Sequence, residues 1–588
     1  MRVLRIFFKL LFILFAVLGG AMVVLALAVF IGWRLLPAKS VPATTLLTLD
    51  LGNGIVEREP EDIFDRLAQG DALPMRTITV ALDAAGRDAR VKGLLLRLGT
   101  GEIGIAQVQE LREAIRAFRE RSKVVYCFAE DFGEGGNGTL RYDLAAGCDE
   151  IWMQPSGEVG LTGFTLETPF VKETLDKLGI KAEMDHREDY KGAVNTLTSA
   201  AMPAPQRENM QRLVDSWLTQ VTADIAEGRK IDSTEVQGLV DRGPFLANDA
   251  VALKLIDKLG YRDQADAAAK KHAGTTETMS LADYAEALPE PLSDAPRIAL
   301  IYSLGDIELG NDEDRGLLGR AAMRSGPMRK ALSDAIDDAD IKAIVLRIDS
   351  PGGSYVASDT IWREVQRARE KNKPLFVSMG NVAASGGYMV AAPARAIVAD
   401  RGTLTGSIGV FGGKIVVRGL WDMAGVHWDG VKAGANADIG SANTPFSPAG
   451  WKYLEASLDA VYADFLKRVT EGRKLSADAT RSAAKGQIWT GADARERGLV
   501  DELGGLSTAI RLARNAAGVP VDAAVRIEQF PAPESGLSLA LRHLLQVSVV
   551  KAGLGPTLSR LSHRLEDVAA VLDGAEGSST ALRLPPLR

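Results

Sequence analysis

A serine followed by two glycines is the clearest candidate nucleophile in this sequence. Ser385 stands in Asn381-Val-Ala-Ala-Ser-Gly-Gly387, after the apolar run 375–378 and before a predicted helix. A serine at a turn between a strand and a helix can present its hydroxyl to a substrate. The same pattern also fits a serine that caps the start of a helix. The serine alone therefore does not decide between the two interpretations.

A second glycine-rich turn, Asp349-Ser-Pro-Gly-Gly353, follows the apolar run 343–348. Because glycine has no Cβ, the backbone N–H groups of such a turn can approach a substrate closely. An oxyanion hole needs donors at about 2.7 to 3.1 Å from the developing negative oxygen. Gly352 and Gly353 are the candidate donors.

The chain is internally repeated, with a separation of about 245 to 250 residues between matching segments. Residues 91–98 resemble 341–348, residues 227–230 recur unchanged as 471–474, residues 139–146 correspond to 385–392, and residues 255–260 match 499–504. The sequence therefore predicts a tandem duplication.

The two halves differ at the positions where chemistry is expected. The register of the glycine turn reads Gly99-Thr-Gly-Glu-Ile103 in the first half, and the register of Ser385 holds Thr139 without the following glycines. Only the second half has the candidate nucleophile together with the glycine turn. We therefore expect one site rather than two.

Each half alternates short apolar runs with longer amphipathic stretches, which is typical of βαβ units. Continuous apolar runs such as 343–348 suit parallel strands that are buried on both faces. The sequence predicts two α/β domains in tandem, and prolines between 288 and 296 favour a boundary there. We place an N-terminal tip and anchor at 1–36, the first domain at 44–264, a linker at 265–296, the second domain at 297–517 and a tail at 518–588.

The segment 10–33 contains no charged residue. As a helix, this segment is long enough to cross a hydrocarbon core of about 30 Å. Arg2, Arg5 and Lys9 precede the segment and only Arg34 follows closely, so the positive-inside rule predicts a cytoplasmic N-terminus. The apolar region of a cleavable signal peptide is usually shorter. We expect a retained transmembrane anchor with the rest of the chain outside the cytoplasm.

Composition excludes several classes of protein. The net charge of −7 argues against nucleic-acid binding as the main task. The five histidines are scattered and Cys127 and Cys148 lack further ligands nearby, so we predict no metal site. The two cysteines could pair in an oxidising compartment or stay as buried thiols. Residues 133–138 are glycine-rich but lack the lysine and hydroxyl of a phosphate-binding loop.

Three motifs give a specific resemblance to a known family. Asp349-Ser-Pro-Gly-Gly-Ser354, Ala384-Ser-Gly-Gly-Tyr388 and Gly402-Thr-Leu-Thr-Gly-Ser-Ile-Gly409 occur in this order. Their order and spacing resemble the signal peptide peptidase A (protease IV) family, in its long, duplicated, membrane-anchored bacterial form. The resemblance covers nearly the whole chain, apart from the tail.

The resemblance implies a role for three residues. It identifies Ser385 as the nucleophile, Lys191 in Asp189-Tyr-Lys-Gly-Ala193 as the general base, and Ser407 as a hydroxyl that bonds to the lysine amine. In the internal repeat Lys191 aligns with Ala437, so each half supplies a group that the other lacks. A lysine can act as a base only when neutral, and burial in an apolar cleft could lower its pKa enough. His186 and His427 are the alternative bases, but neither lies in a recognisable motif.

The resemblance also implies the architecture and the activity. The halves would adopt the crotonase/Clp-protease superfold and assemble as a homotetramer. The activity would be hydrolysis of peptide substrates, namely signal peptide remnants, at the bacterial inner membrane, without a cofactor. Two other functions stay open: an acyl-CoA hydratase or hydrolase of the same superfold, and a catalytically inactive membrane scaffold. The predicted anchor disfavours the first, and a scaffold would need none of the catalytic residues.

Overall fold

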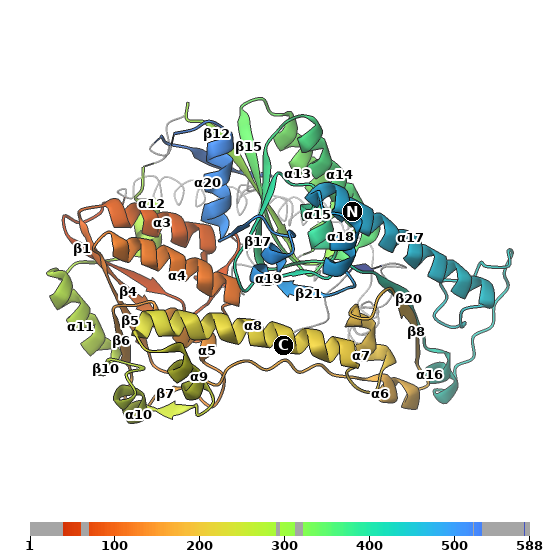
Figure 1. Cartoon of the computed structure of the whole chain (residues 1–588), viewed down its shortest axis with the longest axis horizontal. Helices are drawn as coiled ribbons and strands as arrows, with labels where there is room; N and C mark the ends of the chain where they lie inside the picture. The colour runs from red at the N-terminus through yellow and green to blue at the C-terminus, as the bar shows by residue number, and fades with distance from the viewer. Residues whose placement is uncertain are drawn as a thin grey trace, which may run out of the picture.

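The computed structural model describes residues 39–59, 70–289, 294–311, 322–520, 523–531 and 581–582. The predicted transmembrane segment 10–33 and the tail stretch 537–554, which we expected to form a packing helix, lie outside these ranges. Among the described residues, no helix combines the length and apolar character needed to cross a membrane. The described chain folds into two similar α/β units, shown mainly in red to yellow and in green to blue in Figure 1.

A six-stranded parallel sheet forms the centre of the first unit. Alternate residues of its apolar strands face opposite sides. Leu47 packs with α3 and α4 on one face, whereas Leu46 packs with Ala269 of α11 on the other. The strand order is β10 (Lys258–Leu259), β6 (Glu150–Met153), β5 (Val124–Ala129), β4 (Val91–Arg97), β1 (Thr45–Asp50) and β11 (Thr278–Ser280), and the helices are α3 (Met75–Arg87), α4 (Ile105–Glu120) and α11 (Arg262–Ala273).

The second unit repeats this arrangement in an eight-stranded sheet. Helices α13 (Ser325–Asp337) and α14 (Tyr355–Glu370) cover one face and α20 (Leu506–Ala516) covers the other. The pairs are parallel except for β19 with β21. The strands are β12 (Arg297–Leu304), β15 (Ile341–Ser350), β17 (Leu375–Ala384), β18 (Ala396–Ala399), β19 (Leu404–Gly406), β21 (Ile488–Thr490), β22 (Glu502–Leu503) and β23 (Arg526–Phe530). The predicted α/β fold with parallel sheets is confirmed.

The structure explains why residues 227–230 recur as 471–474. These residues form the ends of two helices of equal length, α8 (Ala204–Arg229) and α17 (Pro448–Arg473). The lysine directly after each helix, Lys230 or Lys474, has a left-handed backbone conformation. A Cβ on Gly228 or Gly472 would lie within 2.5 Å of the carbonyl oxygen of Ala146 or Ala392 respectively, so only glycine allows this packing. The arginines pair with Asp257 and Asp501.

Both units extend further along the chain than we expected. The predicted linker 265–296 contains most of α11, strand β11 and helix α12 (Leu281–Glu286), and β11 pairs with β1. In the predicted tail, β23 pairs with β12 in the same way. Each unit therefore ends with an edge strand beside its first strand.

A segment of the first unit, from β8 to α8, reaches the second unit. Strand β8 (Lys181–His186) pairs antiparallel with β20 (Phe411–Val416), and the long helix α8 runs from the first unit beneath the second (Figure 1). Asn209 on α8 exchanges two hydrogen bonds of 2.9 Å with the backbone of Ile488. A further sheet has the order β14 (Met323–Arg324), β13 (Ile307–Glu308), β16 (Gly353–Ser354), β24 (Ala581–Leu582), β20 and β8.

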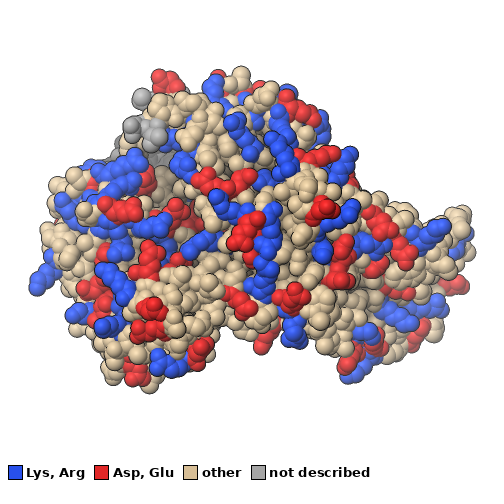
Figure 2. All heavy atoms as spheres, viewed as in Figure 1, with Lys and Arg blue, Asp and Glu red and all other residues tan. Residues whose placement is uncertain are grey.

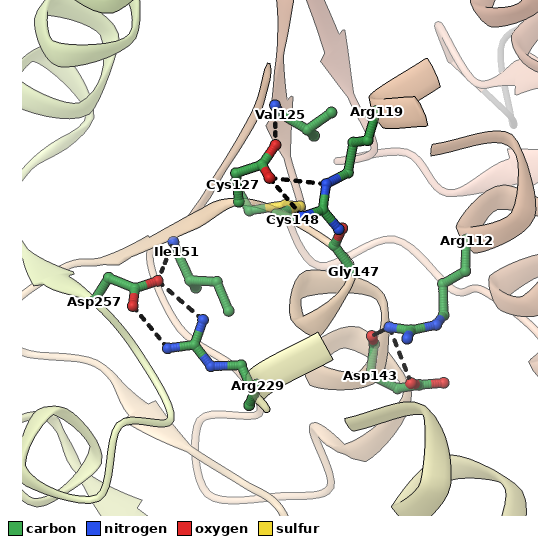
Figure 3. Close-up of a disulfide and its surroundings, with 11 residues drawn as sticks. Arg112, Arg119, Val125, Cys127, Asp143, Gly147, Cys148, Ile151, Arg229 and Asp257 are labelled. Carbon is green, nitrogen blue, oxygen red and sulfur yellow. Dashed lines mark hydrogen bonds and ion pairs between the residues drawn. A yellow bond between two sulfur atoms is a disulfide. The ribbon is translucent and has the colours of Figure 1, made fainter. Parts of the chain in front are cut away.

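Cys127 and Cys148 form a disulfide between β5 and the segment after α5 (Thr139–Ala146) (Figure 3). This answers the question that the sequence left open about the two cysteines. On the molecular face shown in Figure 2, acidic and basic side chains alternate without a continuous basic region.

Candidate active site

Ser385 directly follows the last residue of β17 and precedes α15 (Gly386–Ala391). Its backbone has φ 56° and ψ −116°, a conformation that L-residues rarely adopt and that costs of order 1–3 kcal/mol. The Ser385 amide donates to the Gly406 carbonyl at 2.8 Å, which holds the turn against β19. The strained turn therefore fixes the direction of the Ser385 hydroxyl inside a buried site.

Lys191 belongs to the segment of the first unit that reaches the second unit. It lies in the loop between β8 and α7 (Asn195–Thr198). Its amide donates to the Glu188 carbonyl at 3.2 Å. Two glycines of the second unit make room for the side chain. A Cβ on Gly486 would lie 2.5 Å from the Lys191 nitrogen, and one on Gly409 would lie 3.1 Å from its Cδ. The pairing of β8 with β20 and this close packing place a residue of the first repeat in the second unit.

The structure brings the three residues singled out in the sequence together. The Lys191 Nζ lies 2.7 Å from the Ser385 Oγ, 2.9 Å from the Ser407 Oγ and 2.8 Å from the Ser407 carbonyl oxygen. A neutral amine has two hydrogens and one lone pair. Donation to the two Ser407 oxygens leaves the lone pair free to accept the hydrogen of the Ser385 hydroxyl.

The surroundings of Lys191 favour its neutral form. The side chain is buried, and burial lowers its pKa well below that of an ordinary lysine. Within the described part of the chain, Lys191 forms no ion pair that would stabilise the ammonium. The site therefore holds a lysine that can accept a proton at a pH where exposed lysines are charged.

Ser407 is held in its own strained turn after β19, with φ 50°. Its amide donates to the Gln487 carbonyl at 2.7 Å. The Ser407 hydroxyl and carbonyl both face the Lys191 amine, so this residue can fix the position of the amine on two sides.

The two candidate oxyanion donors differ in their surroundings. The Gly352 amide donates to the Ser350 Oγ at 3.1 Å, so an acceptor within the turn already engages it. Gly353 has φ 157°, and a Cβ there would lie 2.1 Å from the Ile307 carbonyl oxygen. Its nitrogen would lie 3.3 Å from a Cβ on Gly386, the residue after Ser385. The turn is thus next to the serine, with Gly353 as the nearer amide.

In the first unit Thr139 stands at the position of Ser385, and its hydroxyl is engaged in hydrogen bonds within that unit. The Thr139 Oγ donates to the Gly163 carbonyl at 3.2 Å and accepts hydrogen bonds from the amides of Thr162 and Gly163. Gly163 corresponds in the repeat to Gly409, against which Lys191 packs. A buried structural threonine therefore occupies the place of the nucleophile in the first unit.

The alternative bases lie elsewhere. The His186 Nδ1 contacts the Glu188 carbonyl oxygen at 3.0 Å. His427 is exposed, and its nearest charged partner is Asp422 at 3.9 Å. Within the described chain, neither histidine forms a hydrogen bond or ion pair with Ser385, whereas Lys191 does.

Sequence analysis missed a buried ionic cluster behind the glycine turn. Arg347 on β15 is fully buried and donates to Glu57 at 2.8 Å and to Glu110 at 3.0 Å, both of which belong to the first unit. Two residues further along β15, Asp349 accepts a hydrogen bond of 2.9 Å from the Val382 amide on β17. A charged residue inside the apolar run 343–348 was the signal that could have revealed the cluster.

Comparisons with known proteins identify a family of peptidases. The family "Peptidase family S49" matches residues 117–276 and 367–520. The chain is 33% identical to Protease 4 of Salmonella typhi over 74% of this chain and 70% of that protein. It is 30% identical to Protease 4 of Haemophilus influenzae, over 82% and 80% of the two chains. It is 28% identical to the chloroplastic serine protease SPPA of Arabidopsis thaliana, over 92% and 79%.

Proposed function

The chain belongs to peptidase family S49 and is a serine peptidase related to protease IV, and from this premise we propose that Ser385 and Lys191 form its catalytic dyad. One observation carries the proposal: the buried Lys191 Nζ lies 2.7 Å from the Ser385 Oγ. This distance is within the hydrogen-bond reach that a general base needs.

The proposed reaction begins with attack of the Ser385 oxygen on the carbonyl carbon of the scissile peptide bond. The hydroxyl proton moves to the Lys191 amine as the carbon–oxygen bond forms. The backbone amide of Gly353, and that of Gly352 once released from Ser350, would donate to the oxyanion. The Lys191 ammonium then gives its proton to the leaving amine, and the carbon–nitrogen bond breaks. The neutral Lys191 then takes a proton from water as the water oxygen attacks the acyl carbon. The ester bond to Ser385 breaks, and the Lys191 ammonium returns the proton to the Ser385 oxygen.

Ser407 has a positioning role in this proposal. Its hydroxyl and carbonyl oxygens hold the Lys191 amine, so that the remaining lone pair faces Ser385. Removal of the hydroxyl would leave the carbonyl contact. We therefore expect Ser407→Ala to reduce the rate without abolishing it.

The proposed substrates are released signal peptides at the bacterial inner membrane, cleaved by an endopeptidase on the periplasmic side. Support comes from the charge-free segment 10–33 with basic residues before it, and from the family resemblance. The resemblance also supports the crotonase/Clp-protease superfold for both units and a homotetrameric assembly. Protease added to intact spheroplasts tests the orientation, because protection of the chain after residue 37 would contradict it.

The dyad is tested with the purified full chain and a fluorogenic peptide. Ser385→Ala and Lys191→Ala should each lower kcat/KM by at least about 1,000-fold, because the nucleophile and its base act as a unit. Thr139→Ala is the matched control at the corresponding position of the first unit, and it should keep the activity of its folded fraction. Equal loss in Ser385→Ala and Thr139→Ala would contradict the proposal, as would near-normal activity of Lys191→Ala.

The same experiment separates the alternative functions. An acyl-CoA hydratase or hydrolase would act on a thioester substrate and leave peptides intact. A scaffold would show no difference between the wild type and Ser385→Ala. Membership of a peptidase family favours peptide hydrolysis over both.

A further inference from the structure

A cavity of about 380 Å³ lies in the second unit, at the end of the sheet opposite the active site. It opens where β17 and β18 begin, whereas Ser385 follows the last residue of β17. The ends of α14 and α17 form its other walls. Its charged lining comprises five basic residues and one acidic residue: Arg369, Lys373, Arg395, Arg473, Lys474 and Asp501.

Two of these cations are already used within the protein. Arg473 pairs with Asp501 at 2.6 Å. Lys373 donates to the carbonyl oxygens of Asp338 and Ile341 at 2.8 and 2.7 Å. Among the described residues, the side chains of Arg369, Arg395 and Lys474 form no hydrogen bond or ion pair. Within this part of the chain, three cations therefore line one cavity without a carboxylate paired to them.

The internal repeat shows how the same place is built in the first unit. Arg119 corresponds to Arg369, and Asp149 corresponds to Arg395. The backbone confirms the second match, because the Asp149 amide donates to the Val125 carbonyl at 2.9 Å and the Arg395 amide donates to the Leu375 carbonyl at 2.8 Å.

In the first unit the arginine that corresponds to Arg369 is paired internally, whereas the lysine is common to both units, as Lys230 and Lys474. The Arg119 Nε donates a hydrogen bond of 2.9 Å to the Asp149 Oδ1. The other Asp149 oxygen accepts a hydrogen bond of 2.8 Å from the Val125 amide. In the second unit an arginine replaces this aspartate, so the carboxylate is lost and a second guanidinium is added.

Helix dipoles do not account for the change. The carboxyl ends of α14 and α17 favour nearby cations. However, the matching ends of α4 and α8 lie at the same place in the first unit, beside Arg119 and Arg229, and that unit still includes Asp149. The repeat thus acts as an internal control, and the excess positive charge belongs to the second unit.

We propose that this cavity binds a ligand through a phosphate group, held by Arg369, Arg395 and Lys474 in place of the missing carboxylate. Guanidinium groups bind phosphate oxygens through paired N–H donors, and a lysine adds a point charge. The volume lies within the range of small-molecule sites, which is about 300 to 1,000 Å³. The phosphate could belong to a soluble phosphate compound or to the head group of an anionic phospholipid.

The test is calorimetric titration of the detergent-solubilised full chain at constant ionic strength. The probes are inorganic phosphate and short-chain phosphatidylglycerol, with short-chain diacylglycerol, which has no phosphate group, as the lipid control. Arg395→Asp is the informative variant, because it restores the residue of the first unit and allows an ion pair with Arg369. Lys452→Asp makes the same change of charge on an exposed lysine that does not line the cavity.

We expect Arg395→Asp to weaken binding of at least one phosphate probe by about tenfold or more, while Lys452→Asp changes it by less than about twofold. An effect on phosphatidylglycerol alone assigns the phosphate to a lipid head group, and an effect on inorganic phosphate assigns it to a soluble ligand. Peptidase activity of Arg395→Asp serves as the check on folding, and Arg369→Gln replaces it if it does not fold. The proposal is overturned if neither probe binds the wild type, or if the cavity variant binds as tightly as the wild type.

Discussion

At the scale of single residues, the proposed chemistry depends on a lysine whose burial favours the neutral form. Among the residues that the structure describes, Lys191 contacts two serines and no carboxylate, and burial lowers its pKa. Its basic form is therefore present at a lower pH than for an exposed lysine. The turn made Ser385 a candidate and the family resemblance identified it as the nucleophile, whereas Lys191 lies 194 residues away and was selected by the resemblance together with the asymmetric repeat. No local pattern reports which lysine becomes buried.

The first prediction concerns the pH dependence of activity. The value of kcat/KM should rise with pH through the lowered pKa of Lys191, because only the neutral amine can take the Ser385 proton. Lys191→Arg should be as inactive as Lys191→Ala, since a guanidinium keeps its proton. The double replacement of His186 and His427 by Ala should leave the profile in place. A profile that disappears in this double variant would assign the base to a histidine.

The second prediction concerns stability. The folded pKa of Lys191 is lower than the unfolded one, so the folded state binds fewer protons between these two values. The free energy of unfolding should therefore increase with pH across this window. Lys191→Met removes the titrating group but keeps an apolar chain. It should be more stable than the wild type at neutral pH and lack this pH dependence, measured by urea denaturation at several pH values. A Lys191→Met variant that is less stable than the wild type at neutral pH would show that burial of the amine does not lower the free energy of unfolding.

At the scale of secondary-structure elements, strong periodicity was informative and short edge strands were not. The apolar runs of β4 and β15 predicted parallel strands buried on both faces. Strands β11 and β23 were assigned to a linker and a tail instead. They have three and five residues, and polar or half-exposed positions interrupt them. A strand with one neighbour gains its stability from that neighbour, so its own sequence carries little signal.

The third prediction concerns the disulfide, which only the first unit contains. Cys127 and Cys148 are 21 residues apart and correspond in the repeat to the buried Val377 and Ala394. Cys127→Val with Cys148→Ala copies the second unit, so packing is largely kept and the cross-link is removed. The free energy of unfolding should fall by about 3 kcal/mol, as expected for closing a loop of this length. Chemical denaturation under oxidising conditions measures it. A titration that finds two free thiols in the native protein would contradict the prediction.

At the scale of the whole molecule, the duplication yields one composite site because the halves have diverged in opposite ways. The first unit has Thr139 at the position of Ser385 and supplies Lys191, and the second unit supplies Ser385 and the glycine turn. The catalytic geometry therefore depends on how the two units are held together. The sequence predicted the duplication and the complementarity. The sequence did not predict the contacts between the units. Alignment of the two repeats identifies matching positions, but it does not identify residues that contact each other across the interface.

The main buried contact of this kind is the ionic cluster around Arg347. Its guanidinium forms ion pairs with Glu57 and Glu110 of the first unit, and it also donates a hydrogen bond of 2.8 Å to the Ser378 hydroxyl. Glu110 in turn accepts a hydrogen bond of 2.7 Å from the Leu506 amide. Because β15 runs from Arg347 into the turn with Gly352 and Gly353, the cluster fixes the base of the proposed oxyanion hole against the first unit.

The fourth prediction follows from the cost of an unpaired buried charge. Arg347→Met leaves Glu57 and Glu110 close together without a cation, which should lower the free energy of unfolding by about 3 to 5 kcal/mol. The triple variant with Glu57→Gln and Glu110→Gln removes the charges that Arg347 balanced and should recover much of this loss. If the cluster also positions the turn, the triple variant should fold but retain a lower kcat with little change in KM. Urea denaturation and steady-state kinetics on the same three proteins separate the two effects. Full activity in the triple variant would show that the cluster joins the units without aligning the catalytic groups.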